Sequence, residues 1–174
     1  PVADDNLLDE VTGLVEWPNV IMGQIETEFM SLPPEVLVTS MRVHQKFFAL
    51  SQKGATENLA PFFMTVTNRR SDLVNDKLIA AGNERVLRAR LADAKFFYEQ
   101  DKKTPLESLA EKLGAITFYE GLGSVADKAE RMAALAGAIA NHLDAADPDI
   151  ARRAAVLAKV DLASQMVGEF PELQ

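Results

Sequence analysis

The stretch APFFMTVTNRRSDLVNDKLIAAGNERVLRARLADAKFFYEQD, residues 60–101, contains the change of pattern that decides the fold. Residues 60–68 are aromatic, β-branched and apolar, a composition typical of a strand. After Asp72 the apolar residues recur at helical spacing, which predicts a helix over about 73–101. The sequence therefore predicts a small sheet that gives way to helices near residue 72.

The residues before this stretch supply the rest of the sheet. A second apolar run, KFFAL at 46–50, is separated from 60–68 by the Gly-containing loop SQKGATEN, and the two runs predict a β-hairpin. NVIMGQI, after Pro18, is also β-prone, and NLLDEVTGLVE at 6–16 suits a short helix or a helix-to-strand entry. SLPPEVLVTSMRVHQ predicts a further helix with Ser31 as its cap.

The residues after the stretch are helical in pattern. We predict helices at about 105–113, 124–144 and 148–168, with Asp147 capping the last one. One apolar stripe runs along the helix at 124–144 and consists of Val125, Ala129, Met132, Leu135, Ala136, Ile139 and Leu143. The expected fold class is α+β and mostly α, with a small α/β part at 1–72 and a helical part at 73–174 that is incomplete at its C-terminus.

Composition narrows the class of protein. The 174 residues are 48% hydrophobic and 25% charged, which is typical of a folded globular chain. A net charge of −8 argues against a protein that coats DNA or RNA, but it leaves room for a local RNA contact. The absence of Cys excludes disulfides and a thiolate zinc site and suits a reducing cytoplasm. No signal sequence or membrane-spanning run is present, and both ends look cut from a longer chain.

Positive charge is concentrated on the helix predicted at 73–101. Arg85 and Arg88 share its polar sector, opposite the apolar positions, and could contact RNA phosphates. The alternative is a solvated face held by pairs at i,i+4 spacing, Glu84 with Arg88 and Lys95 with Glu99. On the apolar side we expect Arg90 to form a structural, partly buried ion pair with Asp93.

Two other basic clusters admit the same two interpretations. In MRVHQKFF, Arg42, His44 and Lys46 stand beside aromatic residues, so they could hold a nucleotide or merely flank a core. In TNRRSD, Arg69 and Arg70 occupy a loop where they are either solvated or in contact with RNA.

Catalytic motifs are missing from the sequence. The only histidines, His44 and His142, do not form the i,i+4 pair of a helical zinc site. No GxxxxGK[ST], GxGxxG or GxSxG is present, so the sequence predicts neither a phosphate-cradling loop nor a serine nucleophile. We therefore expect no catalytic residue, no metal and no cofactor in these residues.

Several blocks, in order along the chain, carry a family resemblance. They are EVTGLVEWP, LPPEVLVTSMRVHQKFF, AGNERVLRARLADAKFFYEQD, TPLESLAEKL, LGSVADKAERMAALA and AKVDLASQMVGEFPELQ. Together they resemble the beta subunit of bacterial heterotetrameric glycyl-tRNA synthetase, of which this chain would be an interior portion.

The resemblance implies a function and partners. The enzyme of that family is cytoplasmic and joins glycine to tRNA(Gly) with ATP. Its alpha subunit holds glycine, ATP and Mg, and its beta subunit mainly recognises tRNA. The expected partners are thus the alpha subunit and tRNA(Gly), with no membrane and no DNA. The expected tRNA-binding residues are Arg42, His44, Lys46, Arg69, Arg70, Arg85 and Arg88.

The helical part also resembles an HD-type domain, the fold of metal-dependent phosphohydrolases. The family's helix with a His–Asp pair corresponds to LAKVDLA, where Asp161 remains but Val160 stands in place of His. Arg131 lies near another histidine position. Two ligands are missing, so the HD-like part is expected to be a scaffold. Three interpretations stay open: a tRNA-recognition segment, a purely structural linking module, and an HD-type phosphohydrolase.

Overall fold

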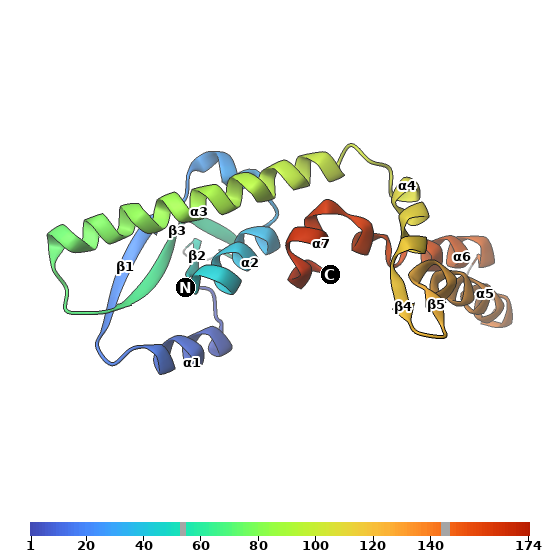
Figure 1. The fold of residues 1–174 in the computed structure, drawn as a ribbon, viewed down its shortest axis with the longest axis horizontal. Helices are drawn as coiled ribbons and strands as arrows, with labels where there is room; N and C mark the ends of the chain where they lie inside the picture. Colours follow the sequence, from blue (N-terminus) through green and yellow to red (C-terminus); the bar gives the residue numbers. More distant parts are fainter. Residues whose placement is uncertain (53–54, 144–146) are drawn as a thin grey trace. The chain divides into compact units, whose positions relative to one another are not determined.

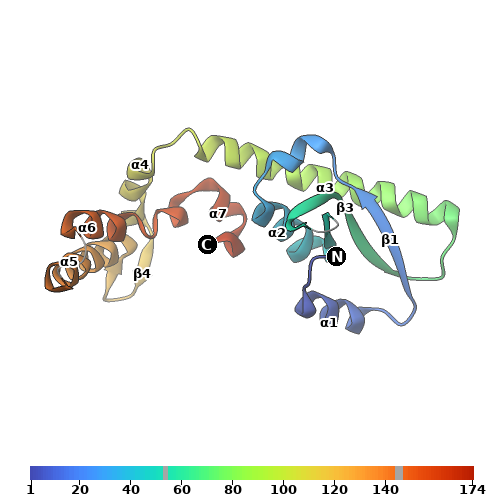
Figure 2. The same cartoon turned by 180° about the vertical axis from the view of Figure 1, so that it is seen from behind.

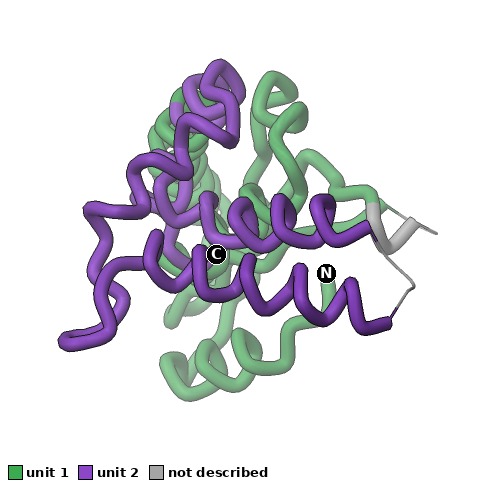
Figure 3. Tube along the Cα trace, turned by 90° about the vertical axis from the view of Figure 1, so that its right-hand side faces the viewer, with its two compact units in different colours: residues 1–96, 173 green, residues 97–172, 174 purple. Residues whose placement is uncertain are grey.

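The computed structural model describes residues 1–52, 55–143 and 147–174; it is drawn in Figure 1 and from behind in Figure 2. The chain divides into two compact units, residues 1–96 with 173 and residues 97–172 with 174 (Figure 3). The division falls inside a helix, whereas the sequence predicts a change of structure near residue 72. The assignment of 1–72 and 73–174 as domains stays a prediction.

The first unit is a three-stranded antiparallel sheet with helices on both faces (Figure 1). Its elements are α1 (Asp5–Leu14), β1 (Pro18–Gln24), the 3₁₀ helix η1 (Thr27–Ser31), α2 (Pro34–Gln45), β2 (Phe48–Gln52), β3 (Ala55–Asn68) and most of α3 (Leu73–Asp101). The strand order is β1-β3-β2, so the predicted hairpin of β2 and β3 is confirmed and β1 pairs with the other side of β3. The predicted loop at 51–58 is wrong in extent, because β2 runs to Gln52 and β3 begins at Ala55, while residues 53–54 lie outside the described residues. The helix predicted at 73–101 is confirmed as α3.

The two faces of the sheet pack against different helices. Each face has its own set of side chains, because successive side chains along a strand point to opposite sides. Ile21, Phe63 and Thr65 share one face of the sheet, and all three are buried. On the same face the Asn19 side chain donates a hydrogen bond to Asp76 of α3, the helix that crosses the sheet (Figures 1 and 2). On the opposite face, Phe48 forms a cluster with Leu7 and Val11 of α1, joined by Met64 and Val66. The sheet is thus the middle layer of this unit.

The start of α2 differs from the expectation, whereas its end at Gln45 agrees with it. Ser31 was expected to cap the helix, but its Oγ donates a hydrogen bond to the Glu28 carbonyl inside η1, and α2 begins at Pro34 with Pro33 before it. The prolines themselves fix where the helix can begin, because a proline at the first turn leaves no amide unsatisfied. At the other end Lys46 adopts a left-handed conformation, φ 54°, and turns the chain into β2.

The second unit is mostly helical, as predicted. After the end of α3 come α4 (Leu106–Ala110), η2 (Glu111–Ala115), β4 (Thr117–Tyr119), β5 (Gly123–Ser124), α5 (Val125–Leu143), α6 (Pro148–Leu157), η3 (Val160–Ala163), α7 (Gln165–Glu169) and η4 (Pro171–Leu173). Its core is a cluster of Leu109, Leu113, Val125 and Val160. Asp147 caps α6 by accepting hydrogen bonds from the amides of Asp149 and Ile150, which confirms the predicted cap.

Two details of this unit differ from the prediction. The short strands β4 and β5 were not foreseen; they pair through a turn in which Gly121 and Gly123 have positive φ. In the described residues no strand follows residue 124. The single helix expected at 148–168 is interrupted after Leu157 and becomes α6, η3 and α7, and the Ser164 Oγ caps α7.

The apolar stripe predicted for α5 is also partly wrong. The residues that α5 buries are Val125, Ala129, Ala133, Gly137 and Ala140. Leu135, Ile139 and Leu143 are instead exposed. α5 packs beside α6 (Figures 1 and 2), and small residues at such a contact let two helix backbones approach closely. The close contact therefore selects the small face rather than the bulky one.

Candidate functional site

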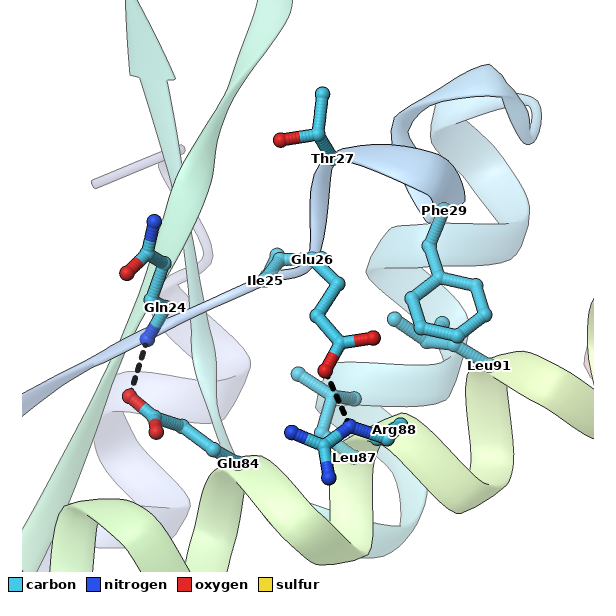
Figure 4. Close-up of a pocket in the computed structure, with 9 residues that line it drawn as sticks. All are labelled: Gln24, Ile25, Glu26, Thr27, Phe29, Glu84, Leu87, Arg88 and Leu91. Carbon is cyan, nitrogen blue, oxygen red and sulfur yellow. Dashed lines mark hydrogen bonds and ion pairs between the residues drawn. The ribbon is translucent and has the colours of Figure 1, made fainter.

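The basic residues of α3 face a short acidic segment of the first unit. Arg88 forms an ion pair with Glu26, and Lys95 Nζ lies 2.7 Å from Glu28 Oε2 (Figure 4 shows the first of these). These bonds replace the i,i+4 pairs that the spacing suggested for Arg88 and Lys95. They join α3 to the segment that leads from β1 through η1, about 60 residues earlier in the chain.

A pocket of about 340 Å³ lies where this segment meets α3. Figure 4 shows the lining residues, with Glu26 paired to Arg88 and the Glu84 carboxylate accepting a hydrogen bond from the Gln24 backbone amide at 2.9 Å. The other lining residues are Thr27 and four apolar ones, Ile25, Phe29, Leu87 and Leu91. The charged groups of the lining bond to other groups of this unit, so the arrangement holds helix and strand together. The described residues that line this pocket include no nucleophilic side chain hydrogen-bonded to a general base.

Arg42 and Lys46 lie at the end of α2 and also meet carboxylates. Arg42 Nε is 2.9 Å from Asp4 Oδ2, and Lys46 Nζ is 2.8 Å from Glu10 Oε1. Both acids belong to α1 or to its cap, so these pairs connect α2 with α1. The neighbouring His44 is exposed.

Arg69 and Arg70 occupy the link between β3 and α3. Arg69 lies 4.0 Å from Asp72, whose pKa is lowered chiefly by a hydrogen bond from the Asn75 side chain and also by one from the Val74 amide. The Arg70 guanidinium lies over the ring of Trp17, 5.0 Å from its centroid. Trp17 is held in place because its amide donates to Asn68 Oδ1 at 2.8 Å.

Arg85 and Arg90 take different positions on α3. Arg85 is exposed, whereas Arg90 is half-buried and the Asp93 proposed as its partner is exposed. The Arg90–Asp93 pair stays a prediction. Among the described residues, Arg70 and Arg85 lie in no ion pair, whereas Arg42, Lys46, Arg69 and Arg88 each do.

The residues that sequence reasoning missed are mainly the acidic partners. Asp4, Glu10, Glu26 and Glu28 pair with basic residues that are distant in sequence. The acidic spacing in QIETE offered a weak signal for two of them. Trp17, the only tryptophan of the chain, was also overlooked as the neighbour of Arg70.

The positions that correspond to HD-type ligands lie in the second unit. Val160 is part of the buried cluster and Asp161 is half-buried beside it. Arg131 donates a hydrogen bond to the Leu122 carbonyl at 3.2 Å. Within residues 1–52, 55–143 and 147–174, no group of three or more His, Asp or Glu residues is placed to hold a metal ion. No helix in those ranges is long and apolar enough to cross a membrane.

Comparison with known proteins gives one consistent result. A family model described as "Glycyl-tRNA synthetase beta subunit" matches residues 1–174. The glycine–tRNA ligase beta subunits of Coxiella burnetii (strain Dugway 5J108-111) and of Marinobacter nauticus are each 49% identical over 173 residues, or 99% of this chain. That of Rhodospirillum centenum is 51% identical over 98% of this chain. The aligned residues make up 24% of each of these relatives, so the chain spans about a quarter of their length.

Proposed function

Since the chain belongs to the family of glycyl-tRNA synthetase beta subunits, we propose that it serves as one segment of such a subunit in the ATP-dependent joining of glycine to tRNA(Gly). The observation that carries this proposal is the family match along all 174 residues at about half identity. In this role the segment contributes to tRNA(Gly) recognition and to the architecture of the subunit in the cytoplasm.

The segment itself does no chemistry in this proposal. Glycine, ATP and Mg bind to the alpha subunit, which is the protein partner of the beta subunit. The HD-like helical part acts as a scaffold, and this agrees with Val160, where a ligand histidine would be expected, being buried among apolar side chains.

The structure favours two of the candidate basic residues for contact with tRNA. A phosphate must compete with any carboxylate that already holds a guanidinium, and Arg42, Lys46, Arg69 and Arg88 each have such a carboxylate. Arg70 and Arg85 are exposed and, in the described part of the chain, lie in no ion pair. We assign the RNA contacts of this segment to Arg70 and Arg85, with His44 as an exposed neighbour on α2.

A purely structural linking module is the second candidate. It is favoured by the same ion pairs, because they explain most of the basic residues without any RNA. The two candidate functions make different predictions. Substitution of Arg70 or Arg85 weakens tRNA binding if the segment recognises tRNA, and leaves it unchanged if the segment is only structural.

The test compares two arginines on one face of one helix in the assembled alpha–beta enzyme. We expect Arg85→Gln to weaken tRNA(Gly) binding and to lower the slope of log affinity against log salt by about 1, as the loss of one phosphate contact does. Arg88→Gln is the matched control and should change both much less, because Glu26 already holds Arg88. Arg70→Gln should behave like Arg85→Gln. If neither Arg70→Gln nor Arg85→Gln alters affinity or salt slope, the segment is a structural module.

A further inference from the structure

One face of the three-stranded sheet is only partly covered by the residues that the structure describes. The other face is crossed by α3, which has 29 residues and a length of about 43 Å at the usual helical rise. The partly covered face packs against α1 instead, and α1 has only 10 residues. α1 packs over β2 and β3, through Phe48, Met64 and Val66.

In the described part of the chain, the outward side chains of β1 are left largely exposed. Val20 pairs with Val66 and Met22 pairs with Met64 across the sheet, so all four share one face. Val20 is 60% exposed and Met22 is 61% exposed. A sheet that lies between two layers of helices normally buries such residues under a helix.

An apolar groove of about 330 Å³ lies between α1 and this bare strip. Its lining includes Leu8, Val11, Val20, Phe48, Met64 and Val66, and it contains no charged residue. On a chain of net charge −8, a continuous uncharged surface of this kind is suited to an apolar partner and not to a polyanion. Nucleic acid is therefore a poor occupant of the groove.

We propose that a second helix packs beside α1 in this groove, and that it comes from the part of the same beta-subunit polypeptide that lies outside residues 1–174. The relatives are long enough to supply it, since the matched residues are 24% of their length. A helix lying next to α1 would cover Val20 and Met22 and complete the layer on this face.

The size of the groove favours a helix of the same chain over a separate protein. Ten residues line the groove, whereas stable association between separate proteins uses about 20–30 residues on each side. A tethered helix is held at high effective concentration and needs less contact area. Beyond the exposed strip and the groove, this inference rests on family membership, and it holds whether or not the segment touches tRNA.

The experiment places a benzophenone amino acid at Met22 in the full-length beta subunit within the alpha–beta enzyme. After irradiation, the cross-linked peptides are mapped by mass spectrometry in a mixture of isotope-labelled and unlabelled subunits. We expect cross-links from position 22 to one helix of the same chain, outside residues 1–174. The control is the same amino acid at Lys77, an exposed position on α3, and it should not give that peptide.

A second measurement covers the case of a poorly reactive probe. Val20→Asp should speed hydrogen exchange at α1 and at one helix of the same subunit outside residues 1–174. Val74→Asp, the same change at an exposed apolar site on α3, should not. Cross-links only within residues 1–174, to a second copy, to the alpha subunit or to tRNA would overturn the proposal. Equal exchange in the two variants together with no cross-link at position 22 would do so as well.

Discussion

At the scale of single residues, Gly23 is the position where the sheet tolerates least change. It faces Phe63 across the β1–β3 ladder, and a Cβ built on Gly23 would lie 2.3 Å from the tip of that ring. The ring cannot move aside easily, because Phe63 is fully buried and stacks on Phe47 with ring centroids 4.5 Å apart. The glycine is thus required by a side chain that fills the space above it.

We therefore predict that Gly23→Ala destabilises the first unit by about 1–3 kcal/mol, the usual cost of overpacking a core. Gly82→Ala is the matched control, because Gly82 lies in α3 with no atom within 4 Å of a built Cβ. It should be neutral or stabilise by up to about 1 kcal/mol through helix propensity. Chemical denaturation of both variants tests this. Equal stability of the two would show that Phe63 does not constrain β1.

The same scale shows how far the candidate site could be predicted. Exposed or half-buried basic residues were foreseen on α2, on α3 and in the loop before α3, because charge pattern is local. Their partners were not foreseen: Glu26 meets Arg88 from 62 residues away, and no local pattern encodes such a contact. Which basic residues bind carboxylates, and which stay available to an anion, is decided by the tertiary fold.

At the scale of elements, the start of α5 depends on a reciprocal cap. The Ser124 amide donates to Asp127 Oδ2 at 2.6 Å, and the Asp127 amide donates back to Ser124 Oγ at 3.2 Å. The pKa of Asp127 is lowered, first by the hydrogen bond from the Ser124 amide and then by that from its side chain. The ionised carboxylate therefore supports the helix end that follows the β4–β5 turn.

This cap should be sensitive to pH in one direction. A lowered pKa in the folded state means that the contribution is present above the ordinary value of 3.8 and is lost as the pH falls through the folded value. We expect Asp127→Asn to loosen the first turn of α5 near neutral pH, with a difference from the parent that shrinks at about pH 3. Hydrogen exchange of the α5 amides, corrected for intrinsic rates, measures it. Glu130→Gln on the same helix is the control, and a difference that grows on acidification contradicts the assignment.

Long elements were predicted well, and short ones were not. The β2–β3 hairpin follows from two apolar runs around a Gly-containing loop, and α3 from 29 residues without a proline. β4 and β5, with three and two residues, are too short to show any pattern. In α5 the helix was right but its buried face was not. Leu135 is more hydrophobic than Gly137, but Leu135 is exposed, whereas Gly137 is buried and lies against Arg152 of α6. Hydrophobicity predicts which residues can be buried, while packing against the partner helix decides which are.

At the scale of the whole molecule, each unit has a core of its own. The cluster of Leu109, Leu113, Val125 and Val160 lies within 97–172, and the cluster beneath α1 lies within 1–96. Apolar contact is the main source of stability in such units. A cavity made in one core should therefore weaken that unit first, even though α3 is continuous through both ranges.

We expect Leu113→Ala, at a side chain that is 1% exposed, to cost the second unit about 2–5 kcal/mol. Hydrogen exchange in the full-length subunit should then accelerate across α4, α5 and α6, while the amides of β1 and β3 keep their protection. Leu37→Ala, at a side chain that is 2% exposed in α2, is the reciprocal control. It should destabilise the first unit and accelerate hydrogen exchange there instead. If either substitution accelerates exchange equally in both units, the two cores unfold as one. The division at residue 96 would then describe geometry and not stability.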